Sequence, residues 1–176
     1  MTLESLLPST SQSYLERWGL KDVPPDSDGL FGGLLLPPDQ HWFLWRLSWL
    51  ALVSAVYATA RGLWDLCWTS WLVLGTSLLY WSKPTRGGRR ALDVTMVQIA
   101  FWWQLYRAWG AEFAAPFYAI SGVGCAFYAG TLYCEHRLKA MWASTLLHAG
   151  VHLCGNLANV VLYSGAIRPL SFSSPA

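Results

Sequence analysis

Residues 140–163, AMWASTLLHAGVHLCGNLANVVLY, decide the fold of this chain. The stretch is long enough to cross the hydrocarbon layer of a bilayer, which takes about 20 residues of α-helix. Its polar residues recur at steps of three and four, at Ser144, His148, His152, Asn156 and Asn159. On a helix they form a stripe on one face. Because polar groups are costly in lipid, that face is expected to turn inward.

Four earlier stretches are similarly apolar. They run at about Trp42–Ala60, Leu63–Ser82, Ala91–Trp109 and Phe113–Cys134. In lipid every backbone N–H and C=O must be hydrogen-bonded within the protein, and for an open chain only the α-helix achieves this. The sequence therefore predicts an all-α fold, a polytopic transmembrane helical bundle of about five spans.

The bundle is expected to occupy residues 41–164. Residues 1–40 precede it as an extramembrane segment, with a short helix near Ser11–Trp18 and then a Pro/Gly-rich loop. Residues 165–176 form a C-terminal tail. Acidic residues outnumber basic ones in the first forty residues, so no cleaved targeting segment is expected.

Composition agrees with a membrane protein and excludes nucleic acid as a partner. Apolar residues make up 54% of the 176 residues and charged residues only 12%, against roughly 25% charged in soluble domains. The net charge is only +2, and the basic residues lie in short loops rather than on one helix face. The four cysteines lie in or beside apolar stretches without CxxC spacing, so we expect buried small side chains.

Basic residues gather in two loops that five crossings would place on one side with the N-terminus. These loops hold six basic residues, Lys83, Arg86, Arg89, Arg90, Arg137 and Lys139. The opposite side of the membrane would hold three, Arg61, Arg107 and Arg168. The positive-inside rule then predicts an N-terminus on the cytoplasmic side or its organelle equivalent.

Tryptophan is unusually frequent, with twelve residues. Those at predicted span ends are expected to form an aromatic belt at the headgroup level, namely Trp42, Trp45, Trp64, Trp81, Trp109 and Trp142. Deeper tryptophans, such as Trp68 and Trp102, are assigned to packing, with a pigment or quinone cleft as the alternative.

His148 and His152 lie one helical turn apart, and two interpretations of this pair stay open. Polar groups of the stripe can bond to neighbouring helices and fix the register of the bundle. Alternatively, the two imidazoles point at one position and bind a metal such as zinc, which then needs a third donor from another helix. The polar stripe could also line a small channel.

Ser77 and Asp93 are the other candidate polar groups at membrane depth. Ser77 lies near the end of the second span and Asp93 near the start of the third, so both fall in or near the membrane half that holds the histidines. Asp93 has an alternative role as a helix-start residue, stabilised by the positive end of the helix and by Arg89 or Arg90.

The order Ser77-x-x-x-Trp81, Asp93 and His148-x-x-x-His152 resembles the core pattern of the alkaline ceramidase, adiponectin receptor and hemolysin III superfamily of membrane hydrolases. The resemblance implies a zinc site with three histidine ligands, with Ser77 and Asp93 holding the water that attacks a lipid amide. In this sequence Trp81 stands where the first histidine ligand is expected, and about five spans replace the usual seven. His41 and His136 fall in predicted loops.

We therefore expect a non-catalytic structural or accessory role within a larger membrane assembly, without a cofactor. The expected partners are membrane lipids and other membrane protein subunits. The alternative is a zinc-dependent lipid amide hydrolase, with Ser77 and Asp93 catalytic and His148 and His152 binding the metal.

Overall fold

A computed structural model describes residues 34–138 and 140–169. The helix expected near Ser11–Trp18 and the end of the C-terminal tail lie outside these residues.

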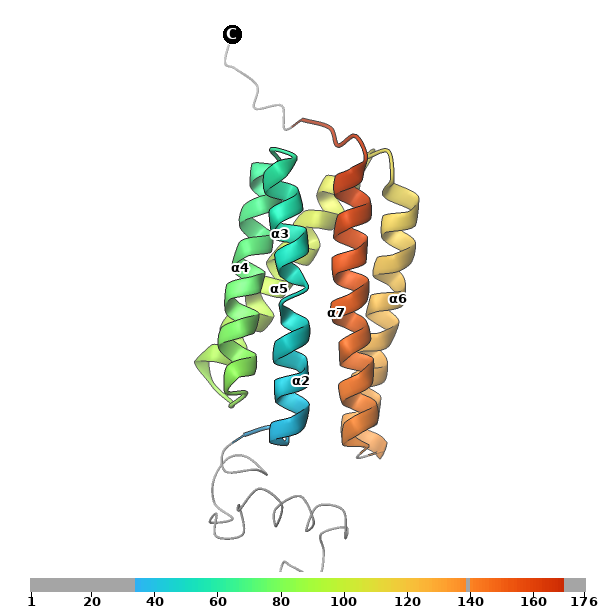
Figure 1. The fold of residues 1–176 in the computed structure, drawn as a ribbon. Coiled ribbons are helices and arrows are strands. Elements are labelled where there is room, and N and C mark those ends of the chain that lie inside the picture. Colours follow the sequence, from blue (N-terminus) through green and yellow to red (C-terminus); the bar gives the residue numbers. More distant parts are fainter. Residues whose placement is uncertain (1–33, 139, 170–176) are drawn as a thin grey trace, which may run out of the picture.

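The described chain is all helical, which confirms the predicted fold class (Figure 1). Its helices are α2 (Pro38–Ser48), α3 (Ala51–Ala60), α4 (Trp64–Ser82), α5 (Gly88–Ala108), α6 (Ala114–Tyr133), the short π-helix η2 (Cys134–Leu138) and α7 (Met141–Ser164). Since α2 and α3 follow one another end to end, and η2 continues α6, the helices of the described residues form five rods, which Figure 1 shows together.

The first rod differs from its prediction in two ways. It begins at Pro38 rather than Trp42, because a proline at the first helical position loses no hydrogen bond and has the right φ. It is also interrupted at Trp49 and Leu50, next to Ser48, whose hydroxyl donates to the Leu44 carbonyl at 3.0 Å. A serine bonded back to the preceding turn commonly bends a helix.

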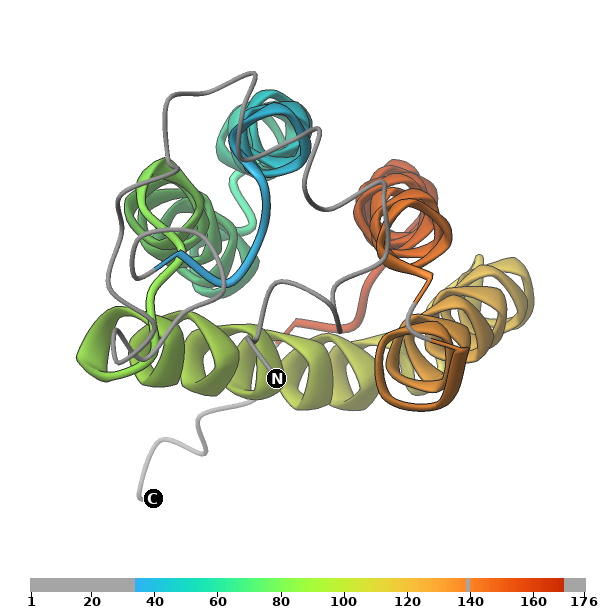
Figure 2. The ribbon, with the colours of Figure 1, turned by 90° about the horizontal axis from the view of Figure 1, so that it is seen from below.

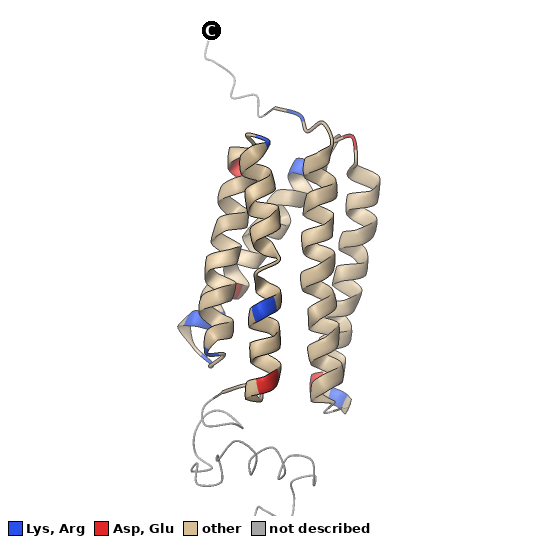
Figure 3. Ribbon diagram, viewed as in Figure 1, with Lys and Arg blue, Asp and Glu red and all other residues tan. Residues whose placement is uncertain are grey.

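Within the described residues, three helices are long and apolar enough to cross a membrane, by length and composition: Pro38–Ala60, Ala114–Leu138 and Met141–Ser164. Most charged residues lie near the ends of the rods (Figure 3). At one end the chain before α2 meets the turn between α4 and α5, where the Leu35 N–H donates to the Pro84 carbonyl at 2.8 Å. The connection between α6 and α7 lies at the same end (Figure 1).

The rods surround a common interior, and α5 is the oblique member. Viewed along the bundle, most rods are seen nearly end-on, whereas α5 is seen from its side (Figure 2). It packs extensively on α4 and only slightly on α6. The most extensive interface of all joins α6 to α7.

Small residues allow α6 and α7 to approach closely, as expected for glycines in membrane helices. A Cβ atom added to Gly124 would lie 3.2 Å from Cys154 Cβ, and one on Gly130 would lie 3.1 Å from Leu147 Cδ1. The tightest position is Gly150 of α7, where an added Cβ would lie 2.6 Å from Phe127 Cδ2.

Replacing Gly150 with alanine is expected to lower the free energy of unfolding by about 1–3 kcal/mol, because the Phe127 ring must move. The matched control is Gly155→Ala on the same helix, whose added Cβ meets nothing within 4 Å and should stabilise the helix by up to about 1 kcal/mol. Thermal unfolding in detergent measures both. Equal stability of the two variants would contradict this packing.

Candidate functional site

A cavity of about 310 Å³ lies inside the bundle and is bordered by residues from every rod. We call it the central cavity. Its polar border includes Ser48 of α2, Ser54 of α3, Ser77 of α4, Asp93 of α5, Ser121 of α6 and His148 and His152 of α7. All four residues singled out as candidate site residues in the sequence therefore border the same space.

The polar stripe of α7 turns inward, as predicted. His148, His152, Asn156 and Asn159 border the central cavity, and Ser144 is buried. Asn156 connects two rods, because its Oδ1 accepts a hydrogen bond from Ser54 Oγ at 2.7 Å. This contact fits the register-fixing interpretation for that residue.

Other members of the stripe are not paired in this way. His152 Nε2 and Asn159 Oδ1 are buried and have no hydrogen-bond partner in the described part of the chain. An unpaired buried polar atom costs about 1–3 kcal/mol, so bonding between helices does not account for the whole stripe.

Ser77 and Asp93 form a closed pair beside the central cavity. Ser77 Oγ donates to Asp93 Oδ1 at 2.6 Å, and Thr76 Oγ1 donates to the same oxygen at 3.3 Å. Because α5 begins at Gly88, Asp93 lies beyond the first turn, and its alternative role as a helix-start residue is wrong. Its carboxylate instead joins α5 to α4.

Trp81 is buried at the end of the central cavity rather than exposed at a membrane interface, so its assignment to the aromatic belt is wrong. Its ring centroid lies 5.1 Å from that of His148 and 6.4 Å from that of His152, both in edge-on geometry. The two imidazole centroids are 5.3 Å apart. The indole thus packs directly against both histidines.

His41 lies in α2 and is buried, not in a loop as expected, because the first rod begins earlier. Its Nδ1 is 3.2 Å from the backbone carbonyl oxygen of Trp81. His136 also lies in a helix, the π-helix η2.

The donor set does not fit a catalytic zinc ion, which takes three protein ligands and one open position. Among residues 34–138 and 140–169, no three His, Cys, Asp or Glu side chains are grouped so that they could hold a metal. The cavity offers the imidazoles of His148 and His152. The indole of Trp81 fills the space beside them and has no lone pair to donate to a metal.

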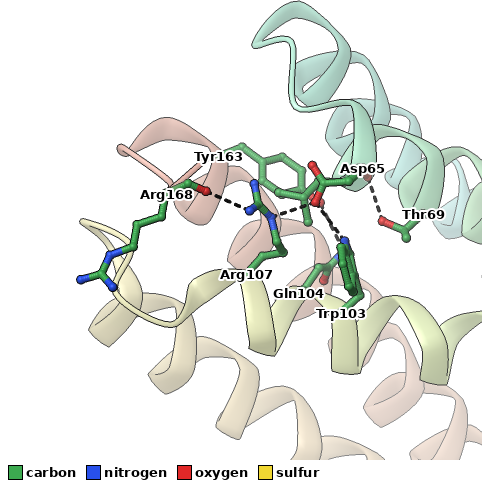
Figure 4. Close-up of polar contacts among 8 residues, drawn as sticks. Asp65, Thr69, Trp103, Gln104, Arg107, Tyr163 and Arg168 are labelled. Atoms are coloured by element: carbon green, nitrogen blue, oxygen red, sulfur yellow. Dashed lines mark hydrogen bonds and ion pairs between the residues drawn. The ribbon is translucent and has the colours of Figure 1, made fainter. Parts of the chain in front are cut away.

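A second polar cluster, which the sequence did not predict, lies near the other end of α4 and α5 (Figure 4). Arg107 Nε is 2.8 Å from Asp65 Oδ2, as an ion pair whose side chains are 7% and 23% exposed. Trp103 Nε1 donates to the same carboxylate oxygen at 3.0 Å, and Arg107 Nη1 donates to the Arg168 carbonyl at 2.9 Å. Arg107, expected among loop charges, is thus a buried residue of α5.

Tyr163 lies beside this cluster and is fully buried (Figure 4). Its hydroxyl oxygen accepts from Gln104 Nε2 at 3.2 Å and lies 3.1 Å from Ser70 Oγ, joining α7 to α4 and α5. The cluster joins three rods and the C-terminal segment through an ion pair and hydrogen bonds, so we assign it to stability.

Comparison with known proteins adds no relative: no protein-family model matches the chain, and neither a curated protein nor a solved structure matches it.

Proposed function

We propose that this multi-pass membrane protein has a non-catalytic, structural or accessory role as a subunit of a larger membrane assembly. The observation that carries the proposal is the position of Trp81, whose ring packs against His148 and His152. A zinc hydrolase of the superfamily that the sequence pattern resembles would need a third metal ligand at this position. Ser77 is closed onto Asp93 and Asn156 accepts a hydrogen bond from Ser54, so these polar residues of the site join neighbouring rods.

The orientation we propose places the end that carries the α4–α5 turn on the cytoplasmic side or its organelle equivalent. The support is the basic residues of that turn and of the connection between α6 and α7.

The second candidate is a zinc-dependent lipid amide hydrolase. One observation favours it, because Ser77, Asp93, His148 and His152 all border the central cavity. It requires a further metal ligand beyond the two imidazoles, and the indole of Trp81 cannot supply one.

Purification in a mild detergent tests the proposal. We expect the chain to co-purify with other membrane proteins at a fixed stoichiometry, measured by quantitative mass spectrometry, and to show no lipid amide hydrolysis. The His148→Ala variant is the matched control and should co-purify with the same proteins at the same stoichiometry. A monomeric protein that hydrolyses a lipid amide, and loses this activity in His148→Ala, would exclude the accessory role.

A further inference from the structure

The central cavity is bordered by two side chains whose hydrogen bonding is incomplete. His152 Nε2 and Asn159 Oδ1 are buried without a hydrogen-bond partner among the described residues, and both side chains border the cavity. Because the terminal torsion of an Asn or His side chain is soft, a modest rotation turns either atom toward the cavity. The cavity therefore offers hydrogen bonds that a bound molecule can complete.

The central cavity is open on the side of α5 and α6. These two rods pack only slightly on each other, and α5 runs obliquely across this side of the bundle (Figure 2). Exposed side chains of both rods border the cavity there, Val94 and Val97 of α5 and Cys125 and Tyr128 of α6. A molecule dissolved in the membrane can thus enter from the side, past the two valines.

Much of the border is apolar. Val73 of α4, Ala100 and Phe101 of α5 and Val151 of α7 contribute apolar surface to the space. Small-molecule sites in proteins measure about 300–1,000 Å³ and combine an apolar lining with a few oriented polar groups. The central cavity, at about 310 Å³, has the size and the composition of such a site.

Charge narrows the class of ligand. Among the described residues no lysine or arginine borders the cavity, and the charged side chain there is Asp93, whose Oδ1 accepts hydrogen bonds from Ser77 and Thr76. An anionic headgroup would lie in the cavity without a counter-ion, which is costly in an apolar surrounding. A cationic one would have to draw Asp93 away from α4. An uncharged ligand requires neither.

The unpaired atoms indicate which polar group the ligand carries. An amide oxygen such as Asn159 Oδ1 only accepts hydrogen bonds, so its partner must be a donor. A ketone, ester or quinone carbonyl cannot donate, whereas a hydroxyl can. His152 Nε2 accepts from a hydroxyl or donates to it, depending on the tautomer. A hydroxyl group therefore suits both side chains.

We infer that the central cavity binds an uncharged lipid alcohol, a membrane-dissolved molecule with an apolar chain and a hydroxyl group. The hydroxyl donates to Asn159, and the chain occupies the apolar part of the cavity and the opening between α5 and α6. This binding goes beyond the accessory role proposed above. It involves no catalysis, because an alcohol has no amide bond to cleave.

Photo-cross-linking in native membranes tests the site. The probe is a long-chain alcohol that carries a diazirine group, and mass spectrometry identifies the labelled residues. We expect saturable labelling of residues that border the central cavity. Unlabelled dodecanol should remove this labelling, whereas dodecane, dodecanoate and dodecylamine should compete about tenfold more weakly, because each lacks the hydroxyl group or carries a charge.

Two glycine variants locate the binding. Gly155 of α7 borders the cavity, and a Cβ added there meets nothing within 4 Å, so Gly155→Phe should fill the space and abolish the saturable labelling. Gly122 of α6 has the same free space but lies outside the border of the cavity. Gly122→Phe is therefore the matched control and should be labelled like the wild type. Circular dichroism verifies that both variants fold.

A third variant tests the hydrogen bond. Asn159→Leu nearly keeps the side-chain volume and removes the acceptor. It should weaken competition by dodecanol about tenfold, because one hydrogen bond to the ligand is lost, and it should leave competition by dodecane unchanged.

The inference is overturned if dodecanoate or dodecylamine competes as well as dodecanol, or if Asn159→Leu leaves the competition by dodecanol unchanged. It is also overturned if the labelling persists in Gly155→Phe, if Gly122→Phe loses it equally, or if no saturable labelling occurs because the cavity holds water alone. These results leave the accessory role intact, since that role is tested by co-purification. A chain that purifies without partner proteins yet binds dodecanol would exclude the accessory role and support this site.

Discussion

Replacing Asp65 with alanine is expected to lower the free energy of unfolding by about 3–5 kcal/mol, because it leaves a buried guanidinium without its counter-ion. Arg107 is enclosed at the junction of α4, α5 and the C-terminal segment, and its Nε lies 2.8 Å from the Asp65 carboxylate. Trp103 loses its hydrogen-bond acceptor in the same substitution. Chemical unfolding in detergent, followed by circular dichroism, measures the loss.

The double variant Asp65→Ala/Arg107→Met is the control for this prediction. Removing both charges should recover much of the lost stability, since a buried ion pair contributes little compared with an apolar replacement. If the double variant is as unstable as Asp65→Ala, the ion pair is not the cause. If Asp65→Ala is as stable as the wild type, Arg107 is not buried as described.

The second large effect concerns metal binding. Trp81→His is expected to bind one zinc ion per chain, because it places a third imidazole beside His148 and His152, whose ring centroids lie 5.1 and 6.4 Å from that of the indole. Metal analysis after dialysis measures the number of zinc ions bound per chain. The smaller side chain also leaves space at the end of the central cavity, which lowers stability in the apo form.

Trp81→Phe is the matched control, since it makes space without adding a nitrogen donor, and it should bind no zinc. Adding His152→Ala to Trp81→His should abolish the binding. A folded Trp81→His variant that takes up no zinc would show that position 81 does not face the histidines at ligand distance.

The fold was largely predictable because hydrophobic length and backbone hydrogen bonding leave few choices in lipid. The second span was expected at Leu63–Ser82 and α4 runs from Trp64 to Ser82, and the last was expected at Ala140–Tyr163 and α7 runs from Met141 to Ser164. The interruption after Ser48 was not predictable, since it depends on local bonding within an otherwise apolar span.

The Ser77–Asp93 contact follows from simple geometry. Each residue lies five positions from the helix end at the turn between α4 and α5, and in an antiparallel helical hairpin such residues lie at the same level. The same reasoning could have found Asp65 and Arg107, which lie 17 and 19 positions from those helix ends. The pair is not predicted from the sequence when Arg107 is assigned to the loop charges.

The inward orientation of Trp81 could not be predicted from the sequence. A tryptophan at a span end usually lies at the headgroup level. This one turns inward instead, and its ring centroid lies 5.1 Å from that of His148 of α7. The early start of α2 likewise decides that His41 is buried against the Trp81 carbonyl.

The most direct test of the central claim is the zinc content of the wild-type protein after expression with added zinc and dialysis. The incomplete donor set predicts a content no higher than that of the His148→Ala/His152→Ala double variant. One zinc ion per wild-type chain, absent from the double variant, would contradict the non-catalytic role proposed for the site.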